Sequence, residues 1–371
     1  MNPTLVILLV ASAVAASCAL VGSFLVLRKL ALLGDAISHA VLPGIVVAFL
    51  ITGSRSPLPM VIGAALLGLL TVFLVELGNR SKRLQEDASI GVVFPALFSI
   101  GVILISRYAG QVDLDLDCVL YGEIAYTPWD LLEVGGQSWG PRALWINGII
   151  LLADLLFVLF FYKELKLTSF DAGLAAALGF SPILMHYLLM GALSVTIVGA
   201  FDSVGAILVV AMLVVPPSTA YLLTEKLSRM IALAVFFGVA SAWLGYAMAR
   251  VLDSSIAGAM ASVSGLLFGI VLLFSPSHGL LAKLLRHRSL SRGMAEQLLL
   301  LHLGQGGQGR SLAGVALRFG WSEKELAKVA GRLEERGWLE ESREGGLCLT
   351  PKGLAAVERS GQAQLRHPLE A

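Results

Sequence analysis

The chain has 371 residues, of which 57% are hydrophobic and only 14% are charged. Soluble domains carry about 25% charged residues, so this composition argues strongly for a membrane protein and against an ordinary soluble enzyme. The charges are also unevenly placed, because residues 1–282 hold 29 of them and residues 283–371 hold 24, with net charges of −3 and +4. The sequence therefore predicts a membrane domain followed by a water-soluble domain.

Apolar runs that approach the length of a bilayer span, about 20 residues, recur through the first domain. They cover residues 5–27, 30–51, 58–78, 90–106, 143–162, 182–200, 204–217, 230–249 and 256–274. The seventh run is rather short, so we predict about eight to nine transmembrane helices. The first residues contain no basic segment, and we expect the first run to be a retained span rather than a cleaved signal.

Basic residues between the runs indicate the orientation, since Lys and Arg are enriched on the cytoplasmic side. If the N-terminus lies outside, the inner connections carry nine basic residues and the outer ones carry four. We therefore expect an outer N-terminus, a cytoplasmic C-terminus and a multi-pass protein of the bacterial cytoplasmic (inner) membrane.

Asp35 and His39 are the sharpest pair of ionisable residues inside a predicted span. Four residues apart, they share one helix face, and His39 lies about 14 Å along a helix that begins near Leu30. A carboxylate with an imidazole suits Mn²⁺, Fe²⁺ or Zn²⁺ as a ligand set, whereas the alternative is a hydrogen bond that only packs the helix. Pro43-Gly44, one turn later, favours the ligand role because a weakened helix there opens a cavity beside the pair.

Three other ionisable residues fall in or beside the spans, where such groups are costly and often functional. Asp202 either lines an entry path for an ion or caps a helix. We interpret His186 as a snorkelling or hydrogen-bonded side chain, and Asp154 as a weak candidate that is protonated or bonded across helices.

Two connections are candidates for contacts with partner proteins. The long outer connection, residues 107–142, contains acidic residues that either attract cations or a basic partner, or form a solvated loop edge: Asp113, Asp115, Asp117 and Glu123. The inner connection, residues 163–182, predicts a short helix parallel to the membrane, capped by Ser169 or Thr168 and ending at Gly179.

The water-soluble part has the pattern of a small winged helix. We predict helices at residues 294–303, 312–319 and 323–336, then two short strands at 338–342 and 346–350, and a last helix at 351–358. The helix at 323–336 mixes Lys and Arg with Glu, whereas a DNA-reading helix shows a clearer basic face. We therefore expect a regulatory or ATPase-contacting module and no nucleic-acid partner.

Several of these segments together resemble the permease subunit of the metal-ion ABC transporter family, which serves manganese, zinc and iron uptake. The similarity covers roughly residues 5–285, and its most specific piece is residues 34–44; residues 113–124, 201–212 and 274–279 also match the family. The extension after the permease resembles the winged helix of iron-dependent repressors. The resemblance implies cytoplasmic ABC ATPase subunits that bind ATP, an extracytoplasmic metal-binding protein that docks on the outer segment, and a second permease copy or paralogue.

The resemblance also assigns site residues. The family's metal-coordinating Asp and His fall on Asp35 and His39, and its ATPase-coupling segment falls on residues 170–179, where we expect contacts from Phe170, Asp171, Ala175, Leu178 and Gly179. The family commonly has an acidic residue where Gly173 stands, so the contact here is expected to depend more on Phe170, Asp171 and the backbone.

We thus predict an all-α polytopic membrane protein with a small α+β winged-helix cytoplasmic domain, divided into residues 1–285 and 286–371. Its predicted function is to conduct a divalent metal, with manganese favoured and iron or zinc as further cargoes, without a permanently bound cofactor and without enzymatic activity of its own. The chain has no GxxxxGK[ST] phosphate loop, so ATP is expected on a partner. The alternatives are an ion-coupled secondary metal transporter with a regulatory tail and a membrane-anchored winged-helix regulator.

Overall fold

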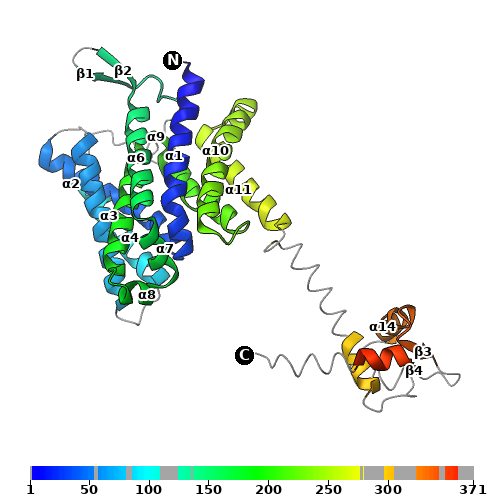
Figure 1. Ribbon diagram of the computed structural model, residues 1–371. Coiled ribbons are helices and arrows are strands. Elements are labelled where there is room, and N and C mark those ends of the chain that lie inside the picture. The colour runs from blue at the N-terminus through cyan, green and yellow to red at the C-terminus, as the bar shows by residue number, and fades with distance from the viewer. Residues whose placement is uncertain are drawn as a thin grey trace. The chain divides into compact units, whose positions relative to one another are not determined.

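The first part of the chain is built from long apolar helices, because in lipid each backbone N–H and C=O must be paired within its own segment. The computed structural model describes residues 2–53, 57–80, 86–108, 124–134, 137–275, 279, 296–304, 323–341 and 347–357. The chain divides into two compact units, Met1–Gly279 and Leu280–Ala371 (Figure 1).

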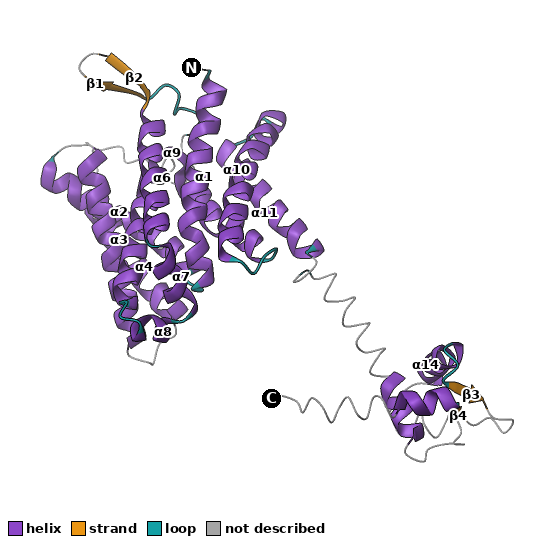
Figure 2. Ribbon diagram, in the orientation of Figure 1, coloured by secondary structure: helices purple, strands orange, loops and turns teal. Residues whose placement is uncertain are grey.

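Eight long helices make up the first unit: α1 Pro3–Leu27, α2 Ala31–Thr52, α3 Pro57–Arg80, α4 Glu86–Tyr108, α6 Arg142–Phe160, α9 Pro182–Tyr221, α10 Leu227–Leu252 and α11 Ile256–Phe274 (Figure 2). Within the described residues they supply nine segments that are long and apolar enough to cross a membrane, since α9 contains two of them. The predicted class of polytopic helical membrane protein is confirmed.

Helix α1 lies at the centre of the unit, and 72% of its apolar 18-residue segment is buried. It packs on α9, α10 and α6, and its side chains Val10, Cys18 and Phe24 have no exposed surface. Helix α4 is much less buried than α1, since only 17% of its apolar 18-residue segment is covered by the rest of the chain. An apolar helix that its own chain leaves bare faces either lipid or another protein.

Helix α9 bends back on itself at Gly205. As a straight helix its 40 residues would be about 60 Å long, twice the hydrocarbon thickness of a bilayer. Gly205 has φ 77° and ψ 164°, a conformation that is essentially restricted to glycine. Both ends of α9 consequently lie near the start of α2: His186 shares a cavity with Leu33, and the Leu213 side chain packs against Gly34.

Helix α2 packs closely against α3 and α4 at Pro43-Gly44. A Cβ atom added to Gly44 would lie 2.5 Å from the Gly63 carbonyl oxygen, so α2 and α3 approach backbone to backbone. Pro43 lies against Gly101 of α4, and α2 continues unbroken to Thr52. The helix is therefore not interrupted at Pro43-Gly44, and a cavity beside Asp35 and His39 stays a prediction.

The outer connection contains a β-hairpin that the sequence did not predict. Strands β1, Leu131–Val134, and β2, Gln137–Pro141, pair antiparallel with Glu133 opposite Ser138. The hairpin and the N-terminus lie at one end of the unit, and the short helix α8 lies at the other (Figure 1). The acidic residues predicted to dock a partner, Asp113, Asp115, Asp117 and Glu123, lie outside the described residues.

The second unit has its own apolar core, formed by Leu299, Leu303, Leu326 and Leu333 among others. Helix α14, Glu323–Glu335, and the antiparallel strands β3, Leu339–Glu341, and β4, Leu347–Leu349, lie where the sequence predicted a helix and two strands. The predicted helix at 312–319 lies outside the described residues. Arg332 of α14 and Arg336, the residue that follows this helix, both form ion pairs with Glu296, at 3.4 and 2.9 Å. Two cations that a DNA-reading helix would present to DNA are therefore paired within the unit.

Replacing Gly205 with Ala should lower the free energy of unfolding by about 1–3 kcal/mol, because an L-residue is strained at this φ and ψ. Thermal unfolding of the detergent-solubilised chain measures the effect. Gly191→Ala in the same helix is the matched control, since its new Cβ would make only an ordinary 3.9 Å contact with Leu69. Equal unfolding temperatures for the two variants would contradict the role of Gly205.

Candidate functional site

Asp35 and His39 lie together on one face of α2, as their spacing predicted. The Nε2 atom of His39 is 3.6 Å from Oδ1 of Asp35, close enough for an ion pair when the imidazole is protonated. Both side chains remain partly accessible, with 47% of Asp35 and 35% of His39 exposed. The pair can therefore present a carboxylate oxygen and an imidazole nitrogen to an ion that reaches this face.

Aromatic side chains of α4 fix the His39 ring from one side. Its centroid is 5.5 Å from that of Phe94 and 6.4 Å from that of Phe98, the latter in an edge-on arrangement. The pair thus lies where α2 meets α4, whose apolar surface is mostly exposed in the single chain. This position matters because an ionisable pair that faced hydrocarbon would be costly.

A complete metal site is not present within the described part of one chain. No group of three or more His, Cys, Asp and Glu side chains is arranged there to hold a metal ion. Asp202 lies inside α9, three residues before the bend at Gly205, and the structure does not describe its side chain. Its proposed roles as a weaker ligand or an entry-path residue stay predictions.

The segment predicted to contact an ATPase forms two helices at one end of the unit, α7 Tyr162–Phe170 and α8 Ala172–Ala177. The predicted cap was wrong, because Ser169 and Thr168 belong to α7, and Asp171 caps α8 by accepting a hydrogen bond from Leu174 N–H at 2.8 Å. Asp171 has extended backbone angles, φ −149° and ψ 94°, which break the helix just where its carboxylate can serve as the cap.

Arg28, at the end of α1, holds α7 in place. Its Nε donates a 3.0 Å hydrogen bond to Ser169 Oγ, and its Nη2 donates a 2.8 Å hydrogen bond to Thr168 Oγ1. Burial lowers the pKa of the Arg28 guanidinium from its usual value, which nevertheless leaves it a cation. The central helix of the unit is thus bonded directly to the α7–α8 segment.

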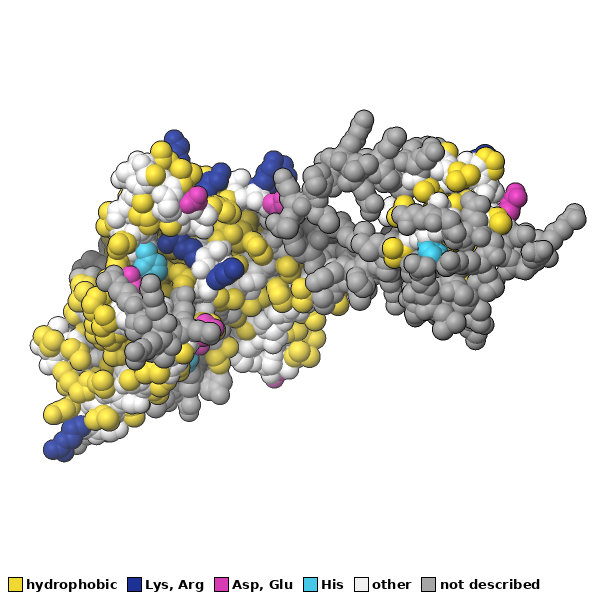
Figure 3. Space-filling model, turned by 90° about the horizontal axis from the view of Figure 1, so that it is seen from below, with side chains coloured by type: hydrophobic (Ala, Val, Ile, Leu, Met, Phe, Trp, Pro, Cys, Tyr) yellow, Lys and Arg dark blue, Asp and Glu magenta, His cyan; other side chains and the backbone are white. Residues whose placement is uncertain are grey.

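The surface of this segment is apolar. Phe170 is 62% exposed and Leu178 is 61% exposed, and Leu174 lies half exposed between them. Ala175 is fully buried and packs α8 onto the unit, so it does not face outward, and Gly179 ends the turn that follows. Figure 3 views this end of the unit and shows several Lys and Arg side chains among the hydrophobic ones.

Polar residues that the sequence left as weak candidates, or did not single out, are paired between helices. The buried Asp154 of α6 accepts a 2.8 Å hydrogen bond from Thr196 of α9, and Asn147 donates one of 2.9 Å to Ser203. Glu76 of α3 accepts a hydrogen bond from Tyr187 of α9. Sequence reasoning missed Glu76 because it falls at the end of an apolar run, where an acidic residue is unremarkable.

Comparison with known proteins agrees with this arrangement. The model of the ABC 3 transport family matches residues 2–275. The chain belongs to the ABC 3 transport family. Among curated proteins of the family, the manganese transport system membrane protein MntD of Bacillus subtilis is 50% identical over 282 residues, which are 76% of this chain and 95% of that protein.

Two further relatives extend the comparison of this ABC 3 family member. The zinc transport system membrane protein TroD of Treponema pallidum is 42% identical over 363 residues, covering 96% of this chain and 98% of TroD, so that alignment includes most of the second unit. A solved structure described as PsaBC from Streptococcus pneumoniae in complex with Fab matches with a TM-score of 0.63 and 32% identity, over 75% of this chain and 94% of that one.

Replacing Thr196 with Val should lower the free energy of unfolding by about 1 kcal/mol, because it removes a hydrogen bond that joins two helices in the membrane. Thr71→Val is the matched control, since the buried Thr71 hydroxyl bonds the Leu67 carbonyl of its own helix. In detergent, the unfolding temperature of Thr196→Val should be lower than that of Thr71→Val. The reverse order would show that the Asp154–Thr196 bond does not stabilise the packing of α6 on α9.

Proposed function

We propose that the chain is the membrane-spanning permease subunit of an ATP-binding-cassette importer for divalent transition-metal ions. It accepts the ion from an extracytoplasmic binding protein and is driven by ATPase subunits on the cytoplasmic side. The observation that carries the proposal is the Asp35–His39 pair, inside a span of an ABC 3 family member and partly exposed on the α2–α4 face.

A second permease, either a copy of this chain or a paralogue, covers that face. The cost of exposing an ionisable pair to lipid supports this arrangement, as does the bare surface of α4. The ion then passes between the two permeases and meets Asp35 and His39 from one side. Two ligands from one chain suit transport, because a conducting site must release the ion as well as bind it.

Manganese is the favoured cargo, and iron or zinc are further ones. Carboxylate and imidazole together suit Mn²⁺, Fe²⁺ and Zn²⁺, so the donor set alone does not separate them. The relative with 50% identity is named for manganese, and the one that aligns over nearly the whole chain is named for zinc.

The α7–α8 segment is the contact for the ATPase. Its exposed Phe170, Leu174 and Leu178 provide an apolar surface at the end opposite the outer hairpin, and Arg28 links it to the central helix. In this orientation the N-terminus and the hairpin face outward in the cytoplasmic membrane, and the acidic outer segment docks the binding protein. The C-terminal domain, residues 286–371, is a winged-helix module with a regulatory or ATPase-contacting role.

Replacing His39 with Ala should lower metal uptake at least about tenfold, because losing even an outer-shell partner of a metal ligand costs 10- to 100-fold. The measurement is Mn²⁺ uptake into proteoliposomes that contain the assembled complex, with Fe²⁺ and Zn²⁺ in competition. Ser38→Ala is the control, since Ser38 is buried and its hydroxyl bonds only the Gly34 carbonyl among the bonds that the structure describes for it. Normal uptake by the His39 variant would remove the site assignment.

Replacing Arg28 with Gln should lower the number of metal ions moved for each ATP hydrolysed, because it removes the two hydrogen bonds that hold α7. Hydrogen bonds to charged groups contribute about 1.5–3 kcal/mol each, enough to loosen the segment. Uptake and ATP hydrolysis are measured together in the same proteoliposomes. Arg229→Gln, which removes an exposed cation at the start of α10, is the control, and an unchanged ratio in both variants would refute the link.

A further inference from the structure

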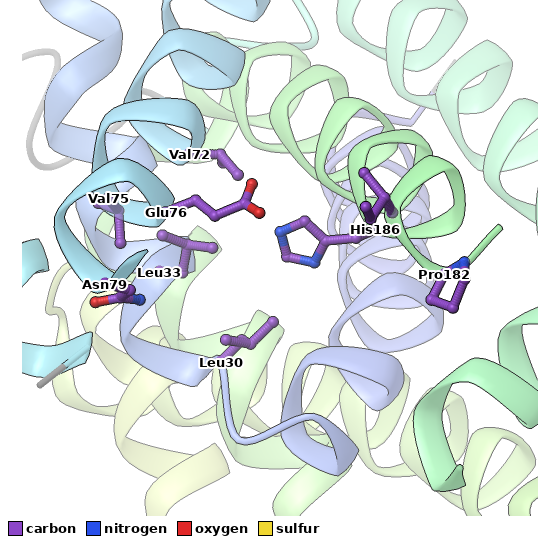
Figure 4. A pocket seen from close by; sticks show the side chains of 9 residues that line it. Leu30, Leu33, Val72, Val75, Glu76, Asn79, Pro182 and His186 are labelled. Atoms are coloured by element: carbon purple, nitrogen blue, oxygen red, sulfur yellow. The ribbon is translucent and has the colours of Figure 1, made fainter. Parts of the chain in front are cut away.

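A cavity of about 350 Å³ lies among α2, α3 and α9, separate from the Asp35–His39 pair. Its walls combine apolar side chains, among them Leu30, Leu33 and Val72, with the polar residues Glu76, Asn79 and His186. Figure 4 shows the Glu76 carboxylate and the His186 imidazole projecting into the same space from opposite helices. Nothing in the proposed path through Asp35 and His39 accounts for these groups.

Helix register places this cavity on the cytoplasmic side of the pair. Gly68 of α3 contacts Ile37 of α2, so Asp35 lies about level with Leu70, and Glu76 is six residues further along α3. At 1.5 Å per residue, Glu76 is displaced from Asp35 by about 9 Å along the helix. Gly68 also contacts Ser194 of α9, and because α9 runs antiparallel to α3 there, His186 is level with Glu76.

The polar groups of the cavity form a suitable donor set for a divalent metal. Glu76 supplies carboxylate oxygens and His186 an imidazole nitrogen, a donor set that suits Mn²⁺ better than a soft ion. Asn79 also lines the cavity, but its Oδ1 atom is buried and points away from Glu76 and His186 (Figure 4). The donors that converge are therefore one carboxylate and one imidazole.

The hydrogen bond between Tyr187 and Glu76 is compatible with metal binding. An ionised carboxylate has about four acceptor positions, and the hydroxyl of Tyr187 occupies one of them. Tyr187 also packs edge-on against the adjacent His186 ring, with centroids 5.7 Å apart. The tyrosine therefore positions both proposed ligands.

We infer that Glu76 and His186 form a second binding site for a divalent cation, which the ion occupies after Asp35–His39 and before it enters the cytoplasm. The inference rests on the proposed transport function. The cavity has room for an ion that keeps several waters, since a water occupies about 30 Å³ of liquid volume. The Arg28 guanidinium also acts electrostatically on His186, and a nearby positive charge lowers the affinity of a site for a cation, which suits a site that must release it.

The experiment measures Mn²⁺ binding to the full-length chain purified in detergent, by the loss of the electron paramagnetic resonance signal of free Mn²⁺. His39→Ala should retain a population of bound Mn²⁺ from the cavity. Adding Glu76→Gln or His186→Gln to that variant should weaken the remaining binding at least about tenfold. Glu76→Gln is nearly isosteric, and its amide oxygen can still accept the hydrogen bond from Tyr187.

Glu225→Gln is the matched control, because it removes one exposed acidic charge from the α9–α10 connection without lining the cavity. In the His39→Ala background, binding by Glu76→Gln and His186→Gln equal to that of Glu225→Gln would overturn the inference. So would the absence of any bound Mn²⁺ in His39→Ala alone.

Failure of the proposed function gives a different result. If His39→Ala transports metal normally while Glu76→Gln weakens Mn²⁺ binding, the transport assignment of Asp35–His39 is lost and the cavity site stands. The two ligands are tested separately, and gel filtration and thermal unfolding identify any variant that does not fold. Tyr187→Phe should weaken Mn²⁺ binding less than Glu76→Gln does, since it removes a positioning group and keeps both ligands.

Discussion

The cost of leaving a polar group unpaired in hydrocarbon governs where this chain can place its ionisable residues. Asp154 satisfies the constraint inside the unit, by bonding Thr196 of the facing helix, and Asn147 bonds Ser203 near the bend of α9. Asp35 and His39 satisfy the constraint only in part. They pair with each other, but both side chains remain partly exposed on the surface of the first unit. Asp154 and Asn147 thus join helices within the chain, whereas Asp35 and His39 are left partly exposed, as the proposed metal site and second subunit require.

The bend at Gly205 brings distant parts of the sequence to one place. It returns the second half of α9 toward the start of α2, where Leu213 packs on Gly34. The first half of α9 carries His186 and Tyr187 to the same end, beside Glu76 of α3. A single glycine conformation therefore shapes the surroundings of both the Asp35–His39 helix and the proposed cytoplasmic site.

Arg28 connects the proposed ATPase contact with the proposed second metal site. Arg28 is bonded to α7, which continues through the cap at Asp171 into the apolar surface of α8. The same guanidinium acts electrostatically on His186 in the neighbouring cavity. A displacement of α7–α8 by an ATPase would act on Arg28 directly, and the charge near the proposed release site would then change with it. If both proposals hold, this shared residue provides a physical route between ATP hydrolysis and metal release.

The sequence by itself determined the membrane class, the nine apolar segments and the stacking of Asp35 with His39, because hydropathy and helical spacing are local properties. It also located α14, β3 and β4, which follow from local amphipathic and alternating patterns. It did not determine which residue caps α8, the close packing beside Pro43, or the facing of Glu76 and His186. The cap at Asp171 is a local bond that depends on where α7 ends. The other two depend on how neighbouring helices are aligned, which brings residues more than 100 positions apart into contact, as with Glu76 and Tyr187, and only the tertiary structure decides such pairings.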